Sequence, residues 1–492
     1  MQTQNLVLEE MPSGYQLPET RNSVLMPNEL KLILIVLLVS TLFLNNGIFL
    51  FLCFLGIMMI VSTMWKPYRP SILLFCFILQ WMQVVAYVLW LNSMDITINE
   101  KYKTVPYAII EALISTVLMA FTVNYMTRKS MDFTLEDLVR EAKKWNKRKI
   151  LVLYGLSTFF LSSVGFIFSD MKSGVTQILV TVQDIKWLFL MVYGIILWST
   201  NARKNIFWLI CLYEIVISFY SYFSDFKTVT FFVLILLLTF TYELNYKKAI
   251  SIIFLAIAMA FMFLTWTAIK GEYRNFLSSG RRLQKVYVSK NEAFQNMIYQ
   301  IGNLDRSKYE KTIAAAMYRV QYLLHLNRVM QRIPSVAPHE NGNLWKSNIE
   351  YIIIPRALFP DKKMFDPSMK TNKYTGFNYA TGKSGVAFSL GYYAESYVDF
   401  GHFWMFLPLI AIAMYVSFIF NTIMKRKDLN LLVRFGMVTT GLMVFATIEA
   451  DGIFLIGRLT IIFIVMLILS YTVFPFLQRW AYETQPKEET DD

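Results

Sequence analysis

Residues 249–269 read AISIIFLAIAMAFMFLTWTAI, a stretch of 21 residues without a charged side chain. A helix rises about 1.5 Å per residue, so a run of this length can cross the hydrocarbon core of a bilayer, which is about 30 Å thick. The stretch therefore predicts a membrane-spanning helix. Charged residues follow it at once, so we expect the helix to leave the membrane near residue 270.

The rest of the chain repeats this pattern. Of its 492 residues 56% are hydrophobic and 16% aromatic, which is too apolar for a soluble protein of this length. The sequence therefore predicts an all-α polytopic membrane protein with about twelve transmembrane helices. The predicted spans are residues 29–45, 47–64, 70–92, 106–127, 149–168, 175–199, 205–224, 228–244, 249–269, 402–424, 429–448 and 453–476.

Basic residues gather in the loops on one side of these spans. Loop 128–149 is amphipathic and carries eight Lys and Arg residues, and 425–427 reads KRK on the same side. Because cytoplasmic loops carry an excess of Lys and Arg, both termini are predicted to be cytoplasmic. The predicted regions are a cytoplasmic tail 1–28, spans one to nine in 29–269, an external loop 270–401, the last three spans in 402–478 and a cytoplasmic tail 479–492.

The external loop 270–401 is too long to be a simple connector. We expect one long helix over 307–334, a second helix that breaks near Pro355, and loops over 359–391. This segment holds 19 Lys and Arg against 10 Asp and Glu, a net charge of +9. The excess predicts an anionic partner, such as a phosphate, an acidic sugar or a lipid headgroup, and no nucleic acid.

Charged residues from four distant parts of the chain are predicted at the outer ends of spans. Ionisable residues inside a membrane cost about 2.5–3.5 kcal/mol each, so they are functional candidates. We expect the four groups to share one pocket that binds substrate. They are Asp225 and Lys227; Lys270, Glu272, Arg274, Arg281 and Arg282; Glu395, Asp399 and His402; and Glu449, Asp451 and Arg458.

Such a pocket suits transfer from a diphosphate-linked donor. The planar guanidinium group of arginine binds phosphate oxygens in pairs, and a carboxylate can take the proton from an attacking hydroxyl. Glu395 and Asp399, four residues apart, are the candidate catalytic acids, and either can be the base. The three histidines lack metal-ligand spacing and the three cysteines lie in apolar spans. We therefore expect neither a metal ion nor a cofactor.

Two short motifs carry a resemblance to a known family. Residues 353–363 read IIPRALFPDKK and residues 391–401 read GYYAESYVDFG. The arrangement resembles the Wzy-type polymerases of O-antigen and exopolysaccharide repeat units, which carry an outer-loop Leu-Phe-Pro segment and a Glu-x-x-x-(Asn/Asp)-Phe-Gly ending. In one departure, Lys227 stands in the turn FSDFKT, where relatives often have an arginine.

The resemblance implies a membrane glycosyltransferase of the GT-C type in the bacterial inner membrane. It implies a polyprenyl-diphosphate-linked oligosaccharide as both donor and acceptor, with membrane lipid around it and a chain-length regulator left open as a partner. The external arginines that would bind the diphosphates are Arg274, Arg281, Arg282, Arg356 and Arg458.

Three alternatives stay open. A lipid-linked glycan ligase would use the same chemistry with a different acceptor. A secondary transporter or flippase of an anionic substrate would use the charges inside the spans at Asp184, Lys186 and Glu214. An anion-binding receptor would use the same basic surface without turnover. The sugars and the linkage are not predicted.

Overall fold

The structure is a computed structural model that describes residues 24–98, 103–167, 182–220, 226–281, 286–354, 359, 362, 365–380 and 387–482. Over these residues the chain is helical, with two isolated bridges and no extended strand, so the all-α prediction is confirmed. Among the described residues, six helices are long and apolar enough to cross a membrane, which indicates a membrane protein. They are α3 (Gly47–Met64), α4 (Ile72–Ser93), α6 (Val105–Thr127) with its extension to Met131, α13 (Tyr246–Leu277), α20 (Phe406–Met424) and α22 (Gly452–Tyr471).

Helices also occupy the other predicted spans, and over the described residues all of them except α8 (Lys147–Ile167, 21 residues) have 15 residues or fewer. The first of them, α2 (Asn28–Ser40), has 13 residues, and a 3-10 turn at Thr41–Phe43 follows it. At 1.5 Å per residue it is about 20 Å long, which is too short for a straight crossing. The others are α8 (Lys147–Ile167), α10 (Ile185–Ser199), α11 (Asn205–Ser218), α12 (Phe226–Phe240) and α21 (Leu431–Leu442) with a 3-10 turn at Met443–Ala446.

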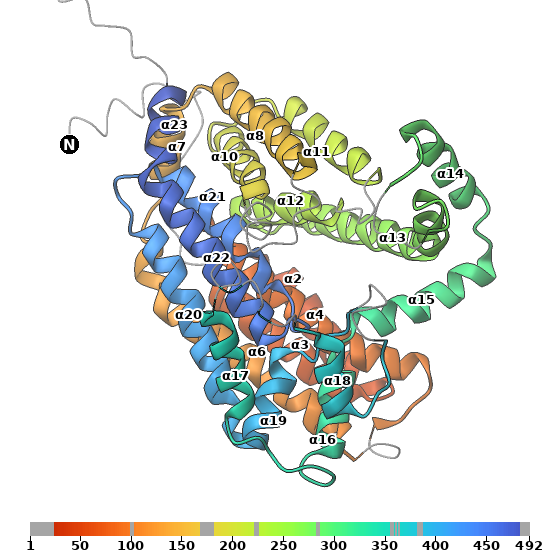
Figure 1. Ribbon diagram of the computed structural model, residues 1–492. Coiled ribbons are helices and arrows are strands. Elements are labelled where there is room, and N and C mark those ends of the chain that lie inside the picture. Colours follow the sequence, from red (N-terminus) through yellow and green to blue (C-terminus); the bar gives the residue numbers. More distant parts are fainter. Residues whose placement is uncertain are drawn as a thin grey trace, which may run out of the picture.

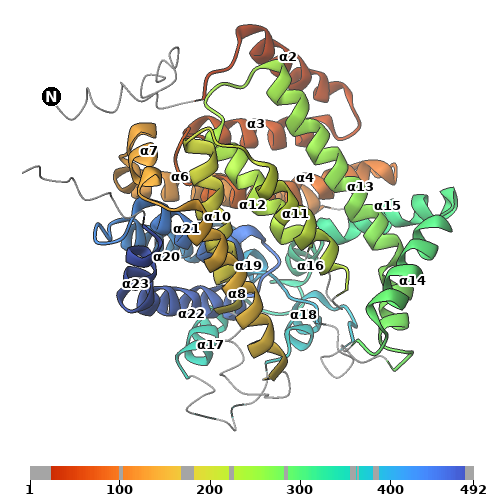
Figure 2. The same ribbon diagram turned by 90° about the horizontal axis from the view of Figure 1, so that it is seen from above.

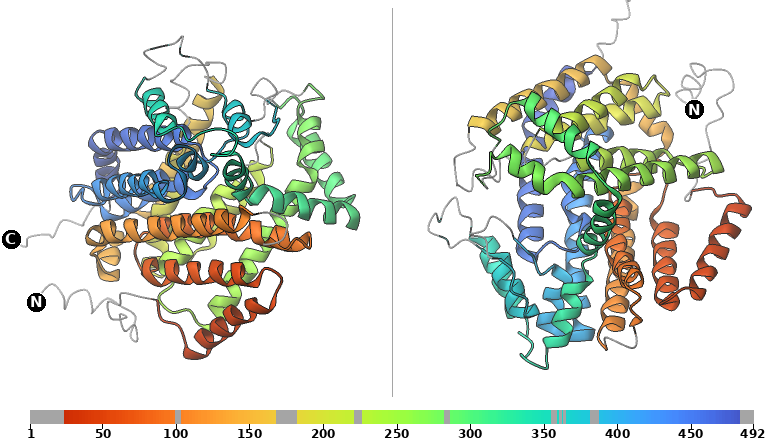
Figure 3. Two further views of the ribbon diagram at one scale, coloured as in Figure 1. Left: turned by 90° about the horizontal axis from the view of Figure 1, so that it is seen from below. Right: turned by 90° about the vertical axis from the view of Figure 1, so that its right-hand side faces the viewer.

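The long helices pack side by side. Helices α3, α4 and α6, coloured red to orange, contact one another (Figure 3), and α20 packs along α6. Helix α10 contacts α8, α12 and α21, as the view from above shows (Figure 2). Figure 1 places α7 (Leu135–Lys143) and α23 (Val473–Ala481) together at one end of the molecule, and α16, α18 and α19 at the other. Different short helices therefore lie at the two ends of the bundle.

Helix α7 forms where loop 128–149 predicts a helix. Thr134 is its N-cap, because its hydroxyl accepts from the N–H of Asp137 at 3.3 Å and the Asp137 carboxylate accepts from the N–H of Thr134 at 2.8 Å. Leu138, Val139 and Ala142 are buried where α7 packs on α10 and α21. The apolar face of this helix therefore rests on protein.

The long helix expected over 307–334 is wrong, because the chain forms two helices there. Helix α15 (Arg306–Val320) ends where Gln321 becomes extended, with φ −70° and ψ 137°. The side-chain oxygen of Gln321 then accepts from the N–H of Leu324 at 3.2 Å, in the first turn of α16 (Leu323–Arg332). One residue thus ends the first helix and caps the second. Helix α15 packs on α4 and α13, whereas α16 packs on α6, α18 and α19.

The loops expected over 359–391 contain a helix, α18 (Pro367–Thr375). Asp366 caps it by accepting from the N–H of Ser368 at 3.0 Å, Pro367 is its first residue, and Gly376 follows its end with φ 72°. These are ordinary start and stop signals of a helix, and the sequence contained them. Helix α17 (Asn343–Ile353) ends before Pro355. Pro355 itself lies outside the described residues.

We predict a pH dependence of stability from His325 on α16. Its ring is buried, its Nε2 is 3.0 Å from the Tyr379 hydroxyl, and burial lowers the pKa of His325 to about 4. The ordinary pKa of histidine is about 6.5, so the folded state keeps the ring neutral where the unfolded state takes up a proton. The stabilisation is complete above about pH 6.5 and is lost as the pH falls to about 4.

The measurement is the thermal unfolding midpoint of the detergent-solubilised protein between pH 7 and 4. His325→Gln removes the titrating ring, so the unfolding midpoint of this variant should fall less steeply than that of the wild type. The difference corresponds to roughly 3 kcal/mol of unfolding free energy between pH 7 and pH 4. Parallel curves for the two proteins would contradict the burial-induced shift at His325.

Candidate functional site

Two neighbouring helices each place a carboxylate at the N-terminus of the other. Glu395 lies in the first turn of α19 (Tyr392–Trp404), and its Oε2 accepts from the N–H of Gly452, the first residue of α22, at 2.8 Å. Asp451 directly precedes α22, and its Oδ1 accepts from the N–H groups of Leu390 and Gly391 at 2.9 and 3.2 Å. Carboxylates are stabilised at helix N-termini by the helix dipole. Each acid therefore holds the start of the other helix.

Lys370 on α18 lies between these two carboxylates. It forms an ion pair with Glu395, and its Nζ is 3.4 Å from Oδ2 of Asp451. Asn348 on α17 donates from Nδ2 to Oε2 of Glu395 at 3.0 Å. The Lys370 side chain is 8% exposed, that of Glu395 0% and that of Asp451 1%. We call this group the carboxylate interlock: Glu395, Asp451, Lys370 and Asn348, from four different elements.

Two glycines let the backbones approach closely enough for the interlock. Gly391 has φ 87°, and a Cβ there would lie 2.5 Å from the ring of Tyr322. A Cβ on Gly452 would lie 2.7 Å from Oε2 of Glu395 and 2.6 Å from the ring of Trp345. A larger residue at either position would therefore push the two helix starts apart.

Asp399 serves a different helix. It lies one turn after Glu395 and accepts from the N–H groups of Leu344 and Trp345 at 3.0 and 2.7 Å, at the start of α17. Burial raises the pKa of Asp399, and these backbone donors act against that rise. Both acids of residues 391–401 are thus buried, with their oxygens bound to protein donors. The catalytic role predicted for them stays a prediction.

An exposed carboxylate lies next to the interlock. Glu449 is two residues before Asp451, and its side chain is open to solvent. Burial by the surrounding protein nevertheless raises the pKa of Glu449, while the nearby positive charges of Lys227 and Arg319 act against the rise. We use the word recess for this arrangement, in which protein atoms and two cations surround a carboxyl that solvent still reaches. Lys227, at the start of α12, and Arg319, in the last turn of α15, are themselves exposed.

Tyr322 lies between this recess and the interlock. It stands in the link from α15 to α16, its hydroxyl donates to the carbonyl oxygen of Ser389, and its ring packs on Gly391. Burial is the largest cause that raises the pKa of Tyr322, and the charges of Asp451, Glu449 and Glu395 raise it further. All three acids are therefore near one tyrosine. We call Glu449, Lys227, Arg319 and Tyr322 the Glu449 recess.

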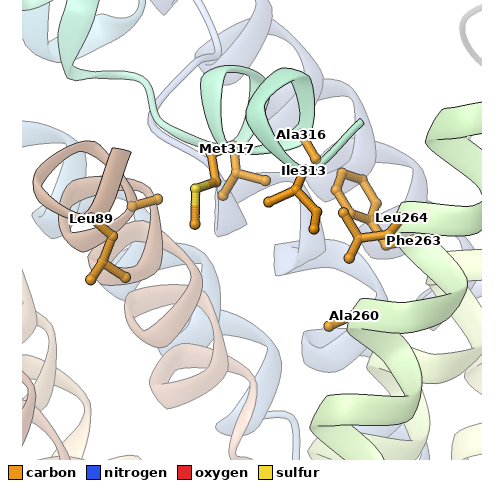
Figure 4. Close-up of a pocket in the computed structure, with 9 residues that line it drawn as sticks. Leu89, Ala260, Phe263, Leu264, Ile313, Ala316 and Met317 are labelled. Atoms are coloured by element: carbon orange, nitrogen blue, oxygen red, sulfur yellow. The ribbon is translucent and has the colours of Figure 1, made fainter. Parts of the chain in front are cut away.

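An apolar groove adjoins the recess along α15. It encloses about 210 Å³ between α4, α13 and α15, and every residue that lines it is apolar (Figure 4). Its lining residues are Ala86 and Leu89 of α4, Ala260, Phe263 and Leu264 of α13, and Ile313, Ala316, Met317 and Val320 of α15. Arg319 follows Ala316 by three residues, so it lies beside the groove-lining face of the helix. The last turn of α15 thus belongs to both the groove and the recess.

Other predicted site residues have partners elsewhere. Arg458 lies six residues after Gly452 on α22, and its guanidinium is 3.5 Å from Asp184, just before α10. Lys186 is 2.7 Å from Glu214 of α11, which also accepts from the hydroxyl of Tyr154. These charges inside the predicted spans are therefore paired between helices, with Glu214 buried and the side chains of Arg458 and Asp184 39% and 31% exposed.

His402, at the far end of α19, is 2.5 Å from Glu111 of α6 through Nδ1, and its Nε2 is 3.2 Å from the Tyr397 hydroxyl. Lys270 and Arg274 lie in the last turns of α13, and Glu272 pairs with Lys308 at 3.1 Å. The Arg281 guanidinium lies over the ring of Tyr287 at 4.7 Å. Asp225, Arg282 and Arg356 lie outside the described residues.

Metal-binding groups do not gather at this site. Over the described part of the chain, no three His, Cys, Asp or Glu residues are placed to hold a metal ion. The cysteines, Cys53, Cys76 and Cys211, are all buried within helices. The expectation of chemistry without a metal or cofactor stays a prediction.

Comparison with known proteins identifies a family. Residues 136–426 match a family model described as a domain of unknown function, DUF8712. Because the match covers more than half of the chain, the protein belongs to this family. No curated protein and no solved structure matches the chain. The matched region includes Lys227, Arg319, Lys370 and Glu395, and it ends before Glu449 and Asp451.

The predicted site residues did not include four members of these groups: Lys370, Arg319, Asn348 and Tyr322. Lys370 was assigned to a loop, although Asp366 and Pro367 mark the start of its helix. Arg319 is one of several basic residues on α15, and no sequence signal distinguishes it from the others. Asn348 contacts Glu395 only because α17 packs on both α19 and α22.

We predict that Lys370→Met strongly destabilises the protein. The substitution leaves two buried carboxylates close together without a cation, and breaking a buried ion pair from one side typically costs about 3–5 kcal/mol. Lys346→Met is the matched control, because Lys346 is 73% exposed and 4.0 Å from Glu350. Thermal unfolding in detergent should show a large loss for Lys370→Met and little change for the control. Equal midpoints for both variants would contradict a structural role of the interlock.

Proposed function

We propose that the protein polymerises polyprenyl-diphosphate-linked oligosaccharide repeat units on the external face of the bacterial inner membrane. In this proposal the chain has a GT-C fold with about twelve membrane spans, and both of its termini are cytoplasmic. The observation that carries it is the apolar groove between two membrane-length helices, directly beside a recess with two cations and a carboxylate. A lipid-linked sugar has the same two parts, an apolar chain and an anionic headgroup. The resemblance in residues 353–363 and 391–401 supports the same class.

In the binding step, the polyprenyl chain of the substrate lies in the groove and its diphosphate faces Lys227 and Arg319. The guanidinium of Arg319 can hold two phosphate oxygens at once, whereas the ammonium of Lys227 acts as a single charge. The groove lining has no polar side chain that would need a hydrogen-bond partner. The two parts of the substrate therefore meet environments that match them.

In the reaction, a sugar hydroxyl of the acceptor attacks the anomeric carbon of the donor. The new glycosidic bond forms as the bond from that carbon to the phosphate oxygen breaks, and the lipid diphosphate leaves with the electron pair. Glu449 accepts the proton of the hydroxyl, because its carboxylate is accessible and its raised pKa makes it a stronger base. Glu395 and Asp399 are less suited to this step, because protein donors occupy their oxygens. Lys227 and Arg319 neutralise the leaving diphosphate.

We predict that Glu449→Gln and Arg319→Ala lower the rate of polymerisation. Loss of a general base typically costs about 10²–10⁴-fold, and loss of one charge-stabilising group costs about 10²–10³-fold. Arg306→Ala is the matched control, because Arg306 is at the other end of α15 and 93% exposed. Each purified protein is incubated with lipid-linked repeat units, and the ladder of product lengths is followed on a gel. An unchanged ladder with Glu449→Gln would exclude it as the base.

The same assay separates the alternatives. A single addition to a lipid A core acceptor, without a ladder, would identify a ligase. Movement of lipid-linked repeats across a vesicle membrane, without any new glycosidic bond, would identify a flippase. Binding of the substrate without either outcome would identify a receptor.

We also predict that filling the groove weakens substrate binding. Ala260 lines the groove and is exposed to it (Figure 4), so Ala260→Phe occupies the space without displacing core residues. Ala258→Phe is the control, because this exposed residue lies two positions earlier, on another face of α13. The apparent KM for lipid-linked substrate should rise about tenfold with Ala260→Phe, with kcat retained, which corresponds to about 1.4 kcal/mol. The same KM for both variants would show that the groove does not hold the lipid chain.

A further inference from the structure

Three cations come together at the opposite end of α4 from the groove. Lys66 and Arg69 lie in the turn between α3 and α4. The Lys66 ammonium donates to Oδ1 of Asn124 on α6 at 3.4 Å. Arg128 follows Asn124 by four residues, so both lie on one face at the end of that helix. Helix α4 has 22 residues, or roughly 33 Å, so this cluster is far from the Glu449 recess.

The cluster holds more positive than negative charge. Burial lowers the pKa of Lys66, and the nearby charges of Arg69 and Arg128 lower it further. Burial also lowers the pKa of Arg69, and the carboxylate of Asp132 acts against that change. Three cations and one acid leave an excess of two positive charges around two half-buried side chains. Such repulsion is relieved when an anion binds.

The cluster lies at the ends of membrane-length helices. Trp65 ends α3, and Tyr125 lies in the last turns of α6 with the Arg128 guanidinium over its ring at 4.5 Å. Tryptophan and tyrosine are enriched where spans meet the headgroups. A helix C-terminus favours one nearby cation, which accounts for Lys66 and Arg128. It does not account for Arg69, which lies beyond both helix ends.

We propose that Lys66, Arg69 and Arg128 form a binding site for a phosphate group at the surface of the bilayer. Two guanidinium groups and an ammonium can each donate to phosphate oxygens, and charge-assisted bonds of this kind are the strong ones. Asn124 positions the ammonium through its side-chain oxygen. The phosphate is that of an anionic phospholipid headgroup or a soluble phosphate. The site does not depend on the proposed polymerase activity.

The test uses the purified full-length protein in neutral detergent. Binding of phosphatidylglycerol is measured by native mass spectrometry, with phosphatidylcholine as the lipid of zero net charge and inorganic phosphate as the soluble competitor. Arg69→Gln should weaken phosphatidylglycerol binding about tenfold, the effect of losing one charge-assisted contact. Lys427→Gln is the control, because Lys427 is an exposed cation in the basic loop after α20.

The outcomes separate the two sources. If inorganic phosphate fails to displace phosphatidylglycerol, the ligand is a lipid headgroup; if it displaces the lipid, soluble phosphate is sufficient. Arg128→Gln, at an exposed position, serves as a second variant should Arg69→Gln fail to fold. The proposal would be overturned if the folded variants bind phosphatidylglycerol as tightly as the wild type. It would also be overturned if Lys427→Gln weakens phosphatidylglycerol binding as much as Arg69→Gln does.

Discussion

The exchange of carboxylates between the starts of α19 and α22 is the constraint on which the end of the molecule around α17, α18 and α19 depends. Its acids lie 56 residues apart in sequence, and Lys370 joins them from a third helix. Buried charges are tolerated only when they are paired, so this contact fixes α17, α18 and the last spans in one arrangement. Glu449 is two residues from Asp451, and Tyr322 packs on Gly391. The recess therefore takes its shape from the interlock.

Much of the fold could be predicted from local patterns. Apolar runs predicted α3, α4, α6, α20 and α22 close to their bounds, because length and apolarity are the properties that a membrane requires. Helix α13 was predicted over 249–269 but runs from Tyr246 to Leu277, past the charged residues that follow the apolar run. The helix over 307–334 could not be predicted correctly from periodicity. Its break at Gln321 comes from tertiary packing, which places α15 on α4 and α13 and places α16 mainly on α6, α18 and α19. Helix α18 was predictable from Asp366, Pro367 and Gly376, and was overlooked among loop residues.

The sequence predicted which residues belong to the site better than it predicted which of them form ion pairs. Glu395 and Asp451 meet at the interlock, and Glu449 and Lys227 are near each other, whereas the roles predicted for these residues stay predictions. Which cation each acid receives depends on distances across the fold, and these leave no mark in the sequence. Arg458 therefore pairs with Asp184, and His402 with Glu111, although both were expected in the common pocket. Asp399 illustrates the same limit, because its helical spacing from Glu395 does not reveal that it binds the start of a helix 55 residues earlier.

The position of α15 has a consequence for how such a protein can change. This helix belongs to a segment predicted to lie outside the membrane, yet it forms one wall of an opening between two spans. The width of that opening is therefore set by side chains such as Ile313 and Met317, whose replacement leaves every span untouched. In the proposed polymerase, selectivity for lipid chains of different thickness can therefore diverge through this one wall, while the surrounding bundle keeps its sequence and its packing.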